Sequence, residues 1–312
     1  MEISILLAEQ ILAMFLTMAV GFGVVRAGLF KTEDSRIISN MVVYICNPCV
    51  VVHSFQIELT DDKIKGLMIA IGLSVVVHMV LIIGSEILSF IFHFNSIEKA
   101  SIIYTNAGYL VIPLVGAVLG EEWVFYTTAF ILVQTVLMWT HGVKLIGQEK
   151  DLNIRKILCN PNVIAMIIGI ALFALEIRLP TVVDSCVSGF GDMISPASMM
   201  VIGMVIGDVD LKWVFRQKRP YLICLLRLIV FPLIAVVAFA GLERSGIHPD
   251  AEYILMIVLI ATAAPAAAMV TQLAQIYGKD SRYASVINVM SVIFCIITMP
   301  VMVLSYEMLI AL

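Results

Sequence analysis

Asn106, Gly108 and Pro113 lie inside an apolar stretch, residues 101–120, that is long enough to cross a lipid bilayer. Proline lacks the backbone donor that a helix interior needs, and the sequence Asn-Ala-Gly favours helix poorly. We therefore expect this helix to break near the middle of the membrane. Lipid cannot satisfy the backbone groups that a break exposes, so protein or a watery cavity must surround it.

A second stretch, residues 260–278, has the same character, because Pro265 lies inside an apolar run that Gly278 ends. Broken helices in corresponding halves of a chain are typical of a transporter's binding site. The second half of a broken helix begins with unpaired N–H groups and a partial positive charge, which suit an anion. The pattern predicts two such ends facing one carboxylate. The alternative is that Pro113 and Pro265 only kink continuous membrane helices.

Side chains beside the two breaks are the candidate substrate ligands. Thr105, Asn106 and Tyr109 would supply oriented donors, and the alanines around Pro265 would let the two chains cross closely. No catalytic residue and no enzymatic reaction are expected. The candidate substrate-binding residues are Asn47, Thr105, Asn106, Gly108, Tyr109, Pro113, Gln134, Ala264, Pro265, Ala266 and Gln272.

Three of these candidates allow a second interpretation. Gln134 and Gln272 would either hydrogen-bond the substrate or make the crossing of the two chains rigid. Asn47-Pro48 interrupts the second predicted helix, as Ser195-Pro196 interrupts the seventh. This pair of interruptions either faces the substrate or marks two packing kinks.

Three ionisable residues fall inside apolar runs, where charge is costly and commonly functional. Arg227 would balance the charge of the substrate or pair with Glu86. His78 or Glu86 would take up a proton that couples to transport. The alternative is that Glu86 and His78 lie in a solvated vestibule, while the Arg227 side chain extends to the membrane surface.

Other kinds of chemistry find less support in the sequence. Cys46-Asn-Pro-Cys49 has the spacing of a redox pair, so a membrane thiol-disulfide oxidoreductase is the alternative function, but no second close cysteine pair could pass electrons on. Asp192 would suit an intramembrane aspartyl protease only with a second buried carboxylate, which no earlier span offers. A passive channel fits helix breaks in a duplicated fold less well than alternating access does.

Cofactor sites are not expected either. The histidines form no metal-ligand spacing with cysteines or carboxylates, and no phosphate-binding loop of the P-loop type occurs. We therefore predict neither a metal nor another cofactor, and ATP would not be the direct energy source within this chain.

Composition sets the class of protein in which these residues must work. Hydrophobic residues make up 61% of the 312 positions and charged residues 13%, and the mean hydropathy is +1.05. Such a chain is a polytopic membrane protein. The net charge of −4 comes from short loops without a basic patch, so no nucleic-acid partner is expected.

Apolar runs between charged or turn-rich segments predict an all-α protein of ten membrane-spanning helices. The linker 148–160 separates a first five-helix repeat, residues 1–147, from a second one, residues 161–312. The predicted spans are residues 4–26, 37–57, 66–92, 99–119, 122–146, 162–177, 182–207, 219–241, 250–277 and 283–310.

Basic residues predict the orientation, because loops rich in Lys and Arg stay in the cytoplasm. Fourteen of the 19 Lys and Arg residues fall in or beside predicted loops one, three, five, seven and nine. Both termini should therefore lie outside and the linker 148–160 inside. The expected location is the cell (inner) membrane.

An odd number of helices in each half requires opposite topologies if the halves share a fold. Traces of such an inverted repeat remain, because matching residues recur at a nearly constant spacing along the two halves. The matches are Met18 with Met166, Gly21 with Gly169, Pro48 with Pro196, and Gly120 with Gly278.

Several stretches, taken in order, resemble the auxin efflux carrier family, in particular bacterial relatives of the plant PIN carriers. They are Asn160-Pro-Asn-Val-Ile-Ala-Met-Ile-Ile-Gly169, Asn106-Ala-Gly-Tyr-Leu-Val-Ile-Pro113-Leu with Gly120-Glu121 after it, Gln134, and Ala261-Thr-Ala-Ala-Pro265. The resemblance runs across essentially the whole chain.

The resemblance implies more than the residues alone do. It implies a scaffold of helices one, two, six and seven and a transport unit of helices three to five and eight to ten. The broken helices four and nine would cross at the substrate site in an elevator-like alternating-access mechanism. It also implies a homodimer and organic-anion substrates, such as indole acids or the dicarboxylates malate and malonate. The long cytoplasmic loop of some plant relatives is missing here.

Overall fold

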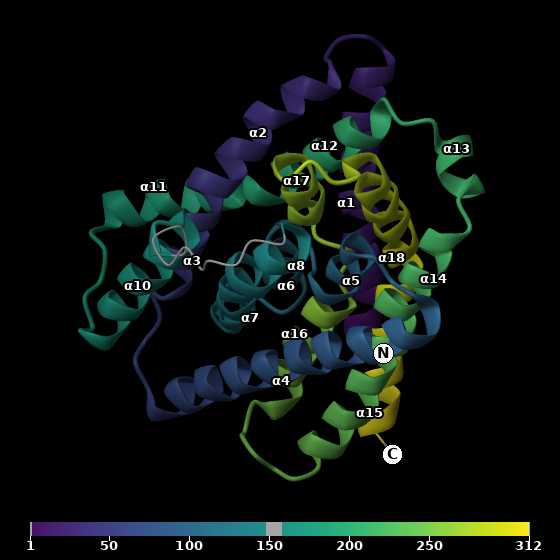
Figure 1. Ribbon diagram of the computed structural model, residues 1–312. Helices are drawn as coiled ribbons and strands as arrows, with labels where there is room; N and C mark the ends of the chain where they lie inside the picture. The colour runs from purple at the N-terminus through teal and green to yellow at the C-terminus, as the bar shows by residue number, and fades with distance from the viewer. Residues whose placement is uncertain (1, 148–157, 312) are drawn as a thin grey trace.

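The computed structural model describes residues 2–147 and 158–311, and these residues form helices joined by short turns (Figure 1). The first half contains α1 (Glu2–Arg26), α2 (Ser35–Met41), α3 (Asn47–Ser54), α4 (Asp61–Phe92), α5 (Ser96–Ile103), α6 (Ile112–Val118), α7 (Val124–Leu137) and α8 (Val143–Gly147). The second half contains α10 (Pro161–Ala174), α11 (Thr181–Asp192), α12 (Ile194–Gly207), α13 (Leu211–Arg216), α14 (Arg219–Leu225), α15 (Phe231–Glu243), α16 (Ala251–Ala263), α17 (Ala268–Ile276) and α18 (Ser281–Ile310).

Wider π-helical turns and narrower 3-10 turns connect some of these helices. The π turns are η2 (Val42–Cys46), η3 (Ala107–Val111), η5 (Met138–Gly142) and η6 (Leu226–Val230), and the 3-10 turns are η1 (Thr32–Asp34) and η4 (Glu121–Trp123). Three of the π turns lead into an α-helix whose second residue is proline: Pro48 in α3, Pro113 in α6 and Pro232 in α15. Because proline has no N–H, the carbonyl four residues earlier in the helix loses its usual donor. In the wider π turn, that carbonyl can accept instead from the N–H of the residue after the proline.

Seven helical segments of the described chain are long and apolar enough to cross a membrane. They are Glu9–Arg26, Thr32–Ser54, Asp61–Phe92, Glu121–Gly147, Thr181–Gly207, Arg219–Glu243 and Ser281–Ile310. Three shorter apolar helices are Ala107–Val118, Pro161–Ala174 and Ala251–Ala263. The chain is therefore an all-helical, multi-span membrane protein.

Each of the ten predicted apolar runs overlaps helices of the structure. The runs 99–119 and 250–277 are each interrupted by a non-helical segment, and two other runs differ in detail. The run 162–177 ends early, because α10 stops at Ala174 and Glu176 adopts a left-handed backbone with φ of 54°. The run 182–207 consists of two helices, α11 and α12, which meet at Met193. Residues 148–157 of the predicted linker lie outside the described residues.

Two groups of helices pack mainly among themselves. In one, α1 lies along α12, and α3 packs against α10 and α11 (Figure 1). In the other, α16 packs against α4, α7, α15 and α18. Contacts of α1 with α6 and α18 join the two groups. Residues 254–264, in and just after α16, are all buried, so this segment is the centre of the second group.

Glycines allow α1 and α12 to approach closely. A side chain at Gly203 would meet the backbone of Met18, and one at Gly21 would meet the backbone of Met200. In a membrane the hydrophobic effect does not drive helices together, so this close backbone packing supplies much of the contact energy.

Candidate functional site

Both helices that were predicted to break are interrupted. α5 ends at Ile103 and α16 ends at Ala263, and the backbone after each becomes extended. We call residues 104–106 and 264–267 together the crossing. The prediction is confirmed for both stretches, but the first break precedes Pro113, which is instead the second residue of α6.

The two interruptions lie side by side and share backbone hydrogen bonds. Thr105 and Ala266 form an antiparallel bridge. The Asn106 N–H donates to the Pro265 carbonyl at 2.8 Å, and the Ala267 N–H donates to the Tyr104 carbonyl at 3.0 Å. Backbone groups that would have been left unpaired in lipid therefore satisfy one another.

Gln134, in α7, holds the first strand of the crossing. Its Oε1 accepts from the Thr105 N–H at 2.8 Å and from the Thr105 hydroxyl at 3.0 Å, and its Nε2 donates to the Thr105 carbonyl at 2.9 Å. A single amide thus satisfies both backbone groups of Thr105. Of the two roles predicted for Gln134, this geometry is that of a rigidifying contact.

Asn288 and Ser291, in α18, hold the second strand in the same way. Asn288 Nδ2 donates to the Ala266 carbonyl at 2.6 Å, and the Ala266 N–H donates to the Ser291 hydroxyl at 3.0 Å. The sequence analysis missed both residues. Their signal is a pair of polar side chains three positions apart, and therefore on one face, in an apolar helix.

Arg227, in η6, binds the carboxyl-terminal ends of both interrupted helices. It is completely buried. Its Nε donates to the Ala264 carbonyl at 3.2 Å, and its Nη1 donates to the Ile102 carbonyl at 3.0 Å. The side chain therefore stays inside the protein and does not extend to the membrane surface.

Glu86 and His78 lie elsewhere than the sequence suggested. Glu86 is half exposed and pairs with Lys99 at 2.7 Å, so the predicted pairing with Arg227 is not found. His78 is completely buried rather than in a solvated vestibule. Its Nδ1 lies 2.7 Å from the Ser74 carbonyl oxygen, and its ring packs on Phe130. Because Glu86 is half exposed and already paired with Lys99, its carboxylate does not extend into the protein core.

The amino-terminal ends of the second half-helices remain open. No side chain caps η3 or α17, although the Leu110 and Val270 N–H groups in their first turns donate to the carbonyls of Asn106 and Ala267. Asn106, which precedes η3, is 4% exposed, and its Nδ2 has no partner among the described residues. The Asn47 Oδ1 is also buried and unpaired, and its Nδ2 would lie 3.2 Å from a Cβ added at Gly108. Polar groups without partners therefore gather at the start of η3.

Three other predicted ligands are not part of this group of unpaired polar atoms at the start of η3. The Tyr109 hydroxyl lies 3.0 Å from the Ser39 hydroxyl, which links η3 to α2. Gln272 is exposed on α17, away from the buried crossing. Pro113 is in the wall of a cavity beside α6.

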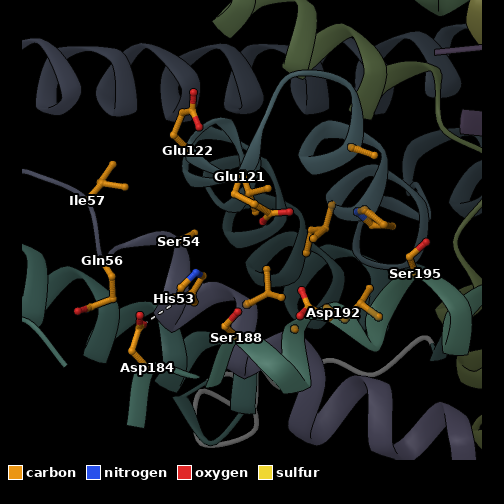
Figure 2. Close-up of a pocket in the computed structure, with 17 residues that line it drawn as sticks. His53, Ser54, Gln56, Ile57, Glu121, Glu122, Asp184, Ser188, Asp192 and Ser195 are labelled. Atoms are coloured by element: carbon orange, nitrogen blue, oxygen red, sulfur yellow. Dashed lines mark hydrogen bonds and ion pairs between the residues drawn. The ribbon is translucent and has the colours of Figure 1, made fainter. Parts of the chain in front are cut away.

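That cavity, which we call the acidic cavity, has a volume of about 380 Å³ and lies between α3, α6, α11 and η4 (Figure 2). Its wall also includes Ser195, at the start of α12. The dashed line in Figure 2 joins His53 Nδ1 to Asp184 Oδ1, which are 2.9 Å apart. Carboxylates dominate its ionisable lining, which consists of His53, Glu121, Glu122, Asp184 and Asp192.

A family model described as a membrane transport protein matches residues 6–156 and 150–303, which together cover nearly all of the chain. The chain belongs to this family, the auxin efflux carrier family. The resemblance inferred from the sequence is thereby confirmed. No curated protein matches the chain.

Membership of this transporter family agrees with the interpretation that the chain is a membrane transporter rather than an enzyme. In this family member, Cys46 and Cys49 are free thiols, and Cys46 is buried. Nothing in their surroundings supports the alternative of a thiol-disulfide oxidoreductase.

A second, much smaller cavity of about 30 Å³ adjoins the crossing of this transporter at Pro265. Three methionines contribute to its wall, Met14 and Met18 from α1 and Met199 from α12. Its lining is apolar throughout, so it offers no second site for a charged group.

Proposed function

We propose that this transporter is a secondary carrier that moves a small organic anion and binds the anion's carboxylate at the crossing. The supporting observation is that the two paired strands of the crossing lead directly into two helices, η3 and α17, whose first turns no side chain caps. Each such end carries roughly half a positive charge, so the two together balance about one carboxylate. Asn106 and Asn47 would orient the bound group through their unpaired amides.

The substrate classes that suit this site are an auxin-like indole acid and a dicarboxylate such as malate or malonate. Both present a carboxylate to the paired helix ends, and the anionic form of each needs a carrier because a charged group crosses the bilayer poorly. The site needs no metal or other cofactor to bind them.

For the mechanism, we propose alternating access in a fold of ten spans arranged as two inverted repeats. The two strands of the crossing are held by similar side-chain hydrogen bonds, and this similarity supports the repeat. Gln134 satisfies both backbone groups of Thr105, while Asn288 and Ser291 satisfy those of Ala266. The group with α1, α3 and α10–α12 would be the scaffold, and the group centred on α16 would move against it. The crossing belongs to the moving group, as an elevator-like motion requires.

The remaining parts of the proposal follow from the family and from the distribution of basic residues. The carrier would form a homodimer in the cell (inner) membrane, with both termini outside. Its partners would be the anion and the lipid bilayer, and no nucleic acid.

A thermal-shift screen of the purified protein tests the substrate class, because a ligand stabilises the state that it binds. We expect indole acids or dicarboxylates to raise the melting temperature, and their neutral amides to have no effect. The Asn106→Ala variant should lose most of the shift, whereas Gln275→Ala, on the exposed side of α17, should keep it. Stabilisation by neutral or cationic solutes alone would rule out an anion carrier.

A further inference from the structure

We infer that Arg227 is a positioning residue of the crossing, whose guanidinium sets the spacing of the two interrupted helices and neutralises their carboxyl-terminal ends. This role differs from the pairing with Glu86 suggested by the sequence, because the hydrogen bonds of Arg227 go to backbone carbonyls and Glu86 pairs with Lys99. The inference deepens the proposed function, since the same two helices carry the proposed anion site.

The first step concerns the two carbonyls that Arg227 binds. In a continuous helix the Ile102 carbonyl would receive the N–H of Asn106, but that N–H donates to Pro265 instead. The Ala264 carbonyl stands just beyond the end of α16, where the helix offers no donor. The interruption thus creates two buried acceptors without backbone donors, and Arg227 supplies both hydrogen bonds.

The second step concerns charge. Among the described residues the ion pairs are His53–Asp184, Lys99–Glu86 and Arg219–Glu98, so no carboxylate offsets the buried charge of Arg227. A helix carboxyl terminus carries roughly half a negative charge. The ends of α5 and α16 therefore sum to about one negative charge, which matches one guanidinium.

The third step concerns rigidity. Arg227 uses Nε and Nη1, two nitrogens fixed in one plane, so the relative position of the two carbonyls follows the shape of a rigid group. The remaining nitrogen, Nη2, has no partner among the described residues, so no other contact of the group competes for its position. A lysine would keep the charge but could not impose the same spacing.

Arg219 provides a matched control. It lies in α14, and Arg227 follows eight residues later in the same helical segment. It also caps backbone carbonyls, those of Phe92 and His93, and it pairs with Glu98 at 2.6 Å. These contacts lie at the carboxyl-terminal end of α4 and the amino-terminal end of α5, whereas the crossing follows the carboxyl-terminal end of α5. The loss of Arg219 should therefore destabilise the protein without opening the crossing.

Hydrogen–deuterium exchange on the purified, folded variants tests the inference independently of any substrate. In Arg227→Met, amides of residues 104–107, 264, 266 and 267 should exchange at least about tenfold faster, because the crossing loses two hydrogen bonds from a charged donor. In Arg219→Met the faster exchange should be confined to residues 92–98. In Arg227→Lys, which serves if the methionine variant does not fold, exchange at the crossing should rise less than in Arg227→Met and more than in Arg219→Met.

Binding of a stabilising carboxylate adds a readout that loss of stability alone would not change. Among folded molecules at equal temperature below melting, Arg227→Met should bind at least about tenfold more weakly, Arg227→Lys should recover part of the loss, and Arg219→Met should bind as the parent does. Unchanged exchange at the crossing in both Arg227 variants would overturn the inference. If the parent binds no carboxylate, the proposed function fails, but the exchange result still decides the role of Arg227.

Discussion

The residues that build the crossing mostly bind backbone rather than one another. Gln134, Asn288, Ser291 and Arg227 all form hydrogen bonds with atoms of residues 102–106 and 264–266. Buried polar groups without partners are costly, so these side chains make the interrupted backbone tolerable inside a membrane. The amides of Asn47 and Asn106 are different, because they keep unpaired atoms at the open end of η3.

Sequence reasoning found the breaks but did not find the partners of Arg227, for which it suggested Glu86 as one option. Proline and Asn-Ala-Gly mark poor helix formation locally, whereas the position of the first break is set by pairing with the second one, which the local sequence does not encode. The acceptors of Arg227 are carbonyls, which every residue carries. A search for charged partners therefore led to Glu86, which pairs with Lys99.

Replacing Gln134 by alanine tests the hydrogen bonds by which the Gln134 amide holds Thr105, which we call the clamp. The change leaves one buried N–H and one buried carbonyl unpaired, so we expect the free energy of unfolding to fall by about 2–4 kcal/mol. Thermal or denaturant unfolding in detergent measures the loss. Gln275→Ala, at an exposed position of α17, should change stability by less than about 0.5 kcal/mol. Equal stabilities of the two variants would show that the clamp contributes nothing.

At the scale of helices, the apolar pattern predicted the elements well, and proline placed the irregular ones. Pro48, Pro113 and Pro232 do not end their helices, because each follows a π turn that accommodates the missing donor. Proline in a membrane sequence therefore indicates a change in hydrogen bonding without saying whether the helix stops. At 104–106 and 264–267 it stops, because a second interrupted strand is available to pair with it.

Packing of α1 on α12 gives a prediction about helix contact. The Gly203→Ala variant should lose about 2 kcal/mol or more of stability, because the added Cβ would meet the Met18 backbone, which cannot rotate away. Gly241→Ala, in α15, is the matched control, since nothing lies near its Cβ position.

The control should gain up to about 1 kcal/mol from better helix propensity. The melting temperatures of the two variants should therefore move in opposite directions. A tolerated Gly203→Ala would mean that α1 and α12 are not held in close contact.

At the scale of the whole molecule, the acidic cavity and the proposed anion site have opposite electrostatic character. In the sequence, Asp192 was considered only as a protease candidate and Glu121 only as part of the family resemblance, and neither was assigned to a common site. Only the fold brings them together around one space (Figure 2). An anion that enters from this side passes carboxylates before it reaches the crossing, which should slow its arrival.

Neutralising the cavity tests this effect. The double variant Glu122→Gln, Asp192→Asn should lower the KM for an anionic substrate on the cavity side several-fold at low salt, because repulsion is removed. The difference should shrink as salt approaches about 0.15 M, where the screening length is about 8 Å. Glu33→Gln, in η1 and outside the cavity, should leave the KM unchanged. A KM that does not respond to either salt or the double variant would contradict a route through this cavity.

The central claim is that the crossing binds the transported anion, and counterflow in proteoliposomes measures this most directly. Vesicles loaded with unlabelled indole acid or dicarboxylate should accumulate the labelled compound when they contain the parent protein. Gly108→Leu, whose Cβ alone would lie 3.2 Å from the Asn47 Nδ2 and so crowd that amide, should abolish accumulation while the protein remains folded. Accumulation that persists undiminished in folded Gly108→Leu would contradict the account.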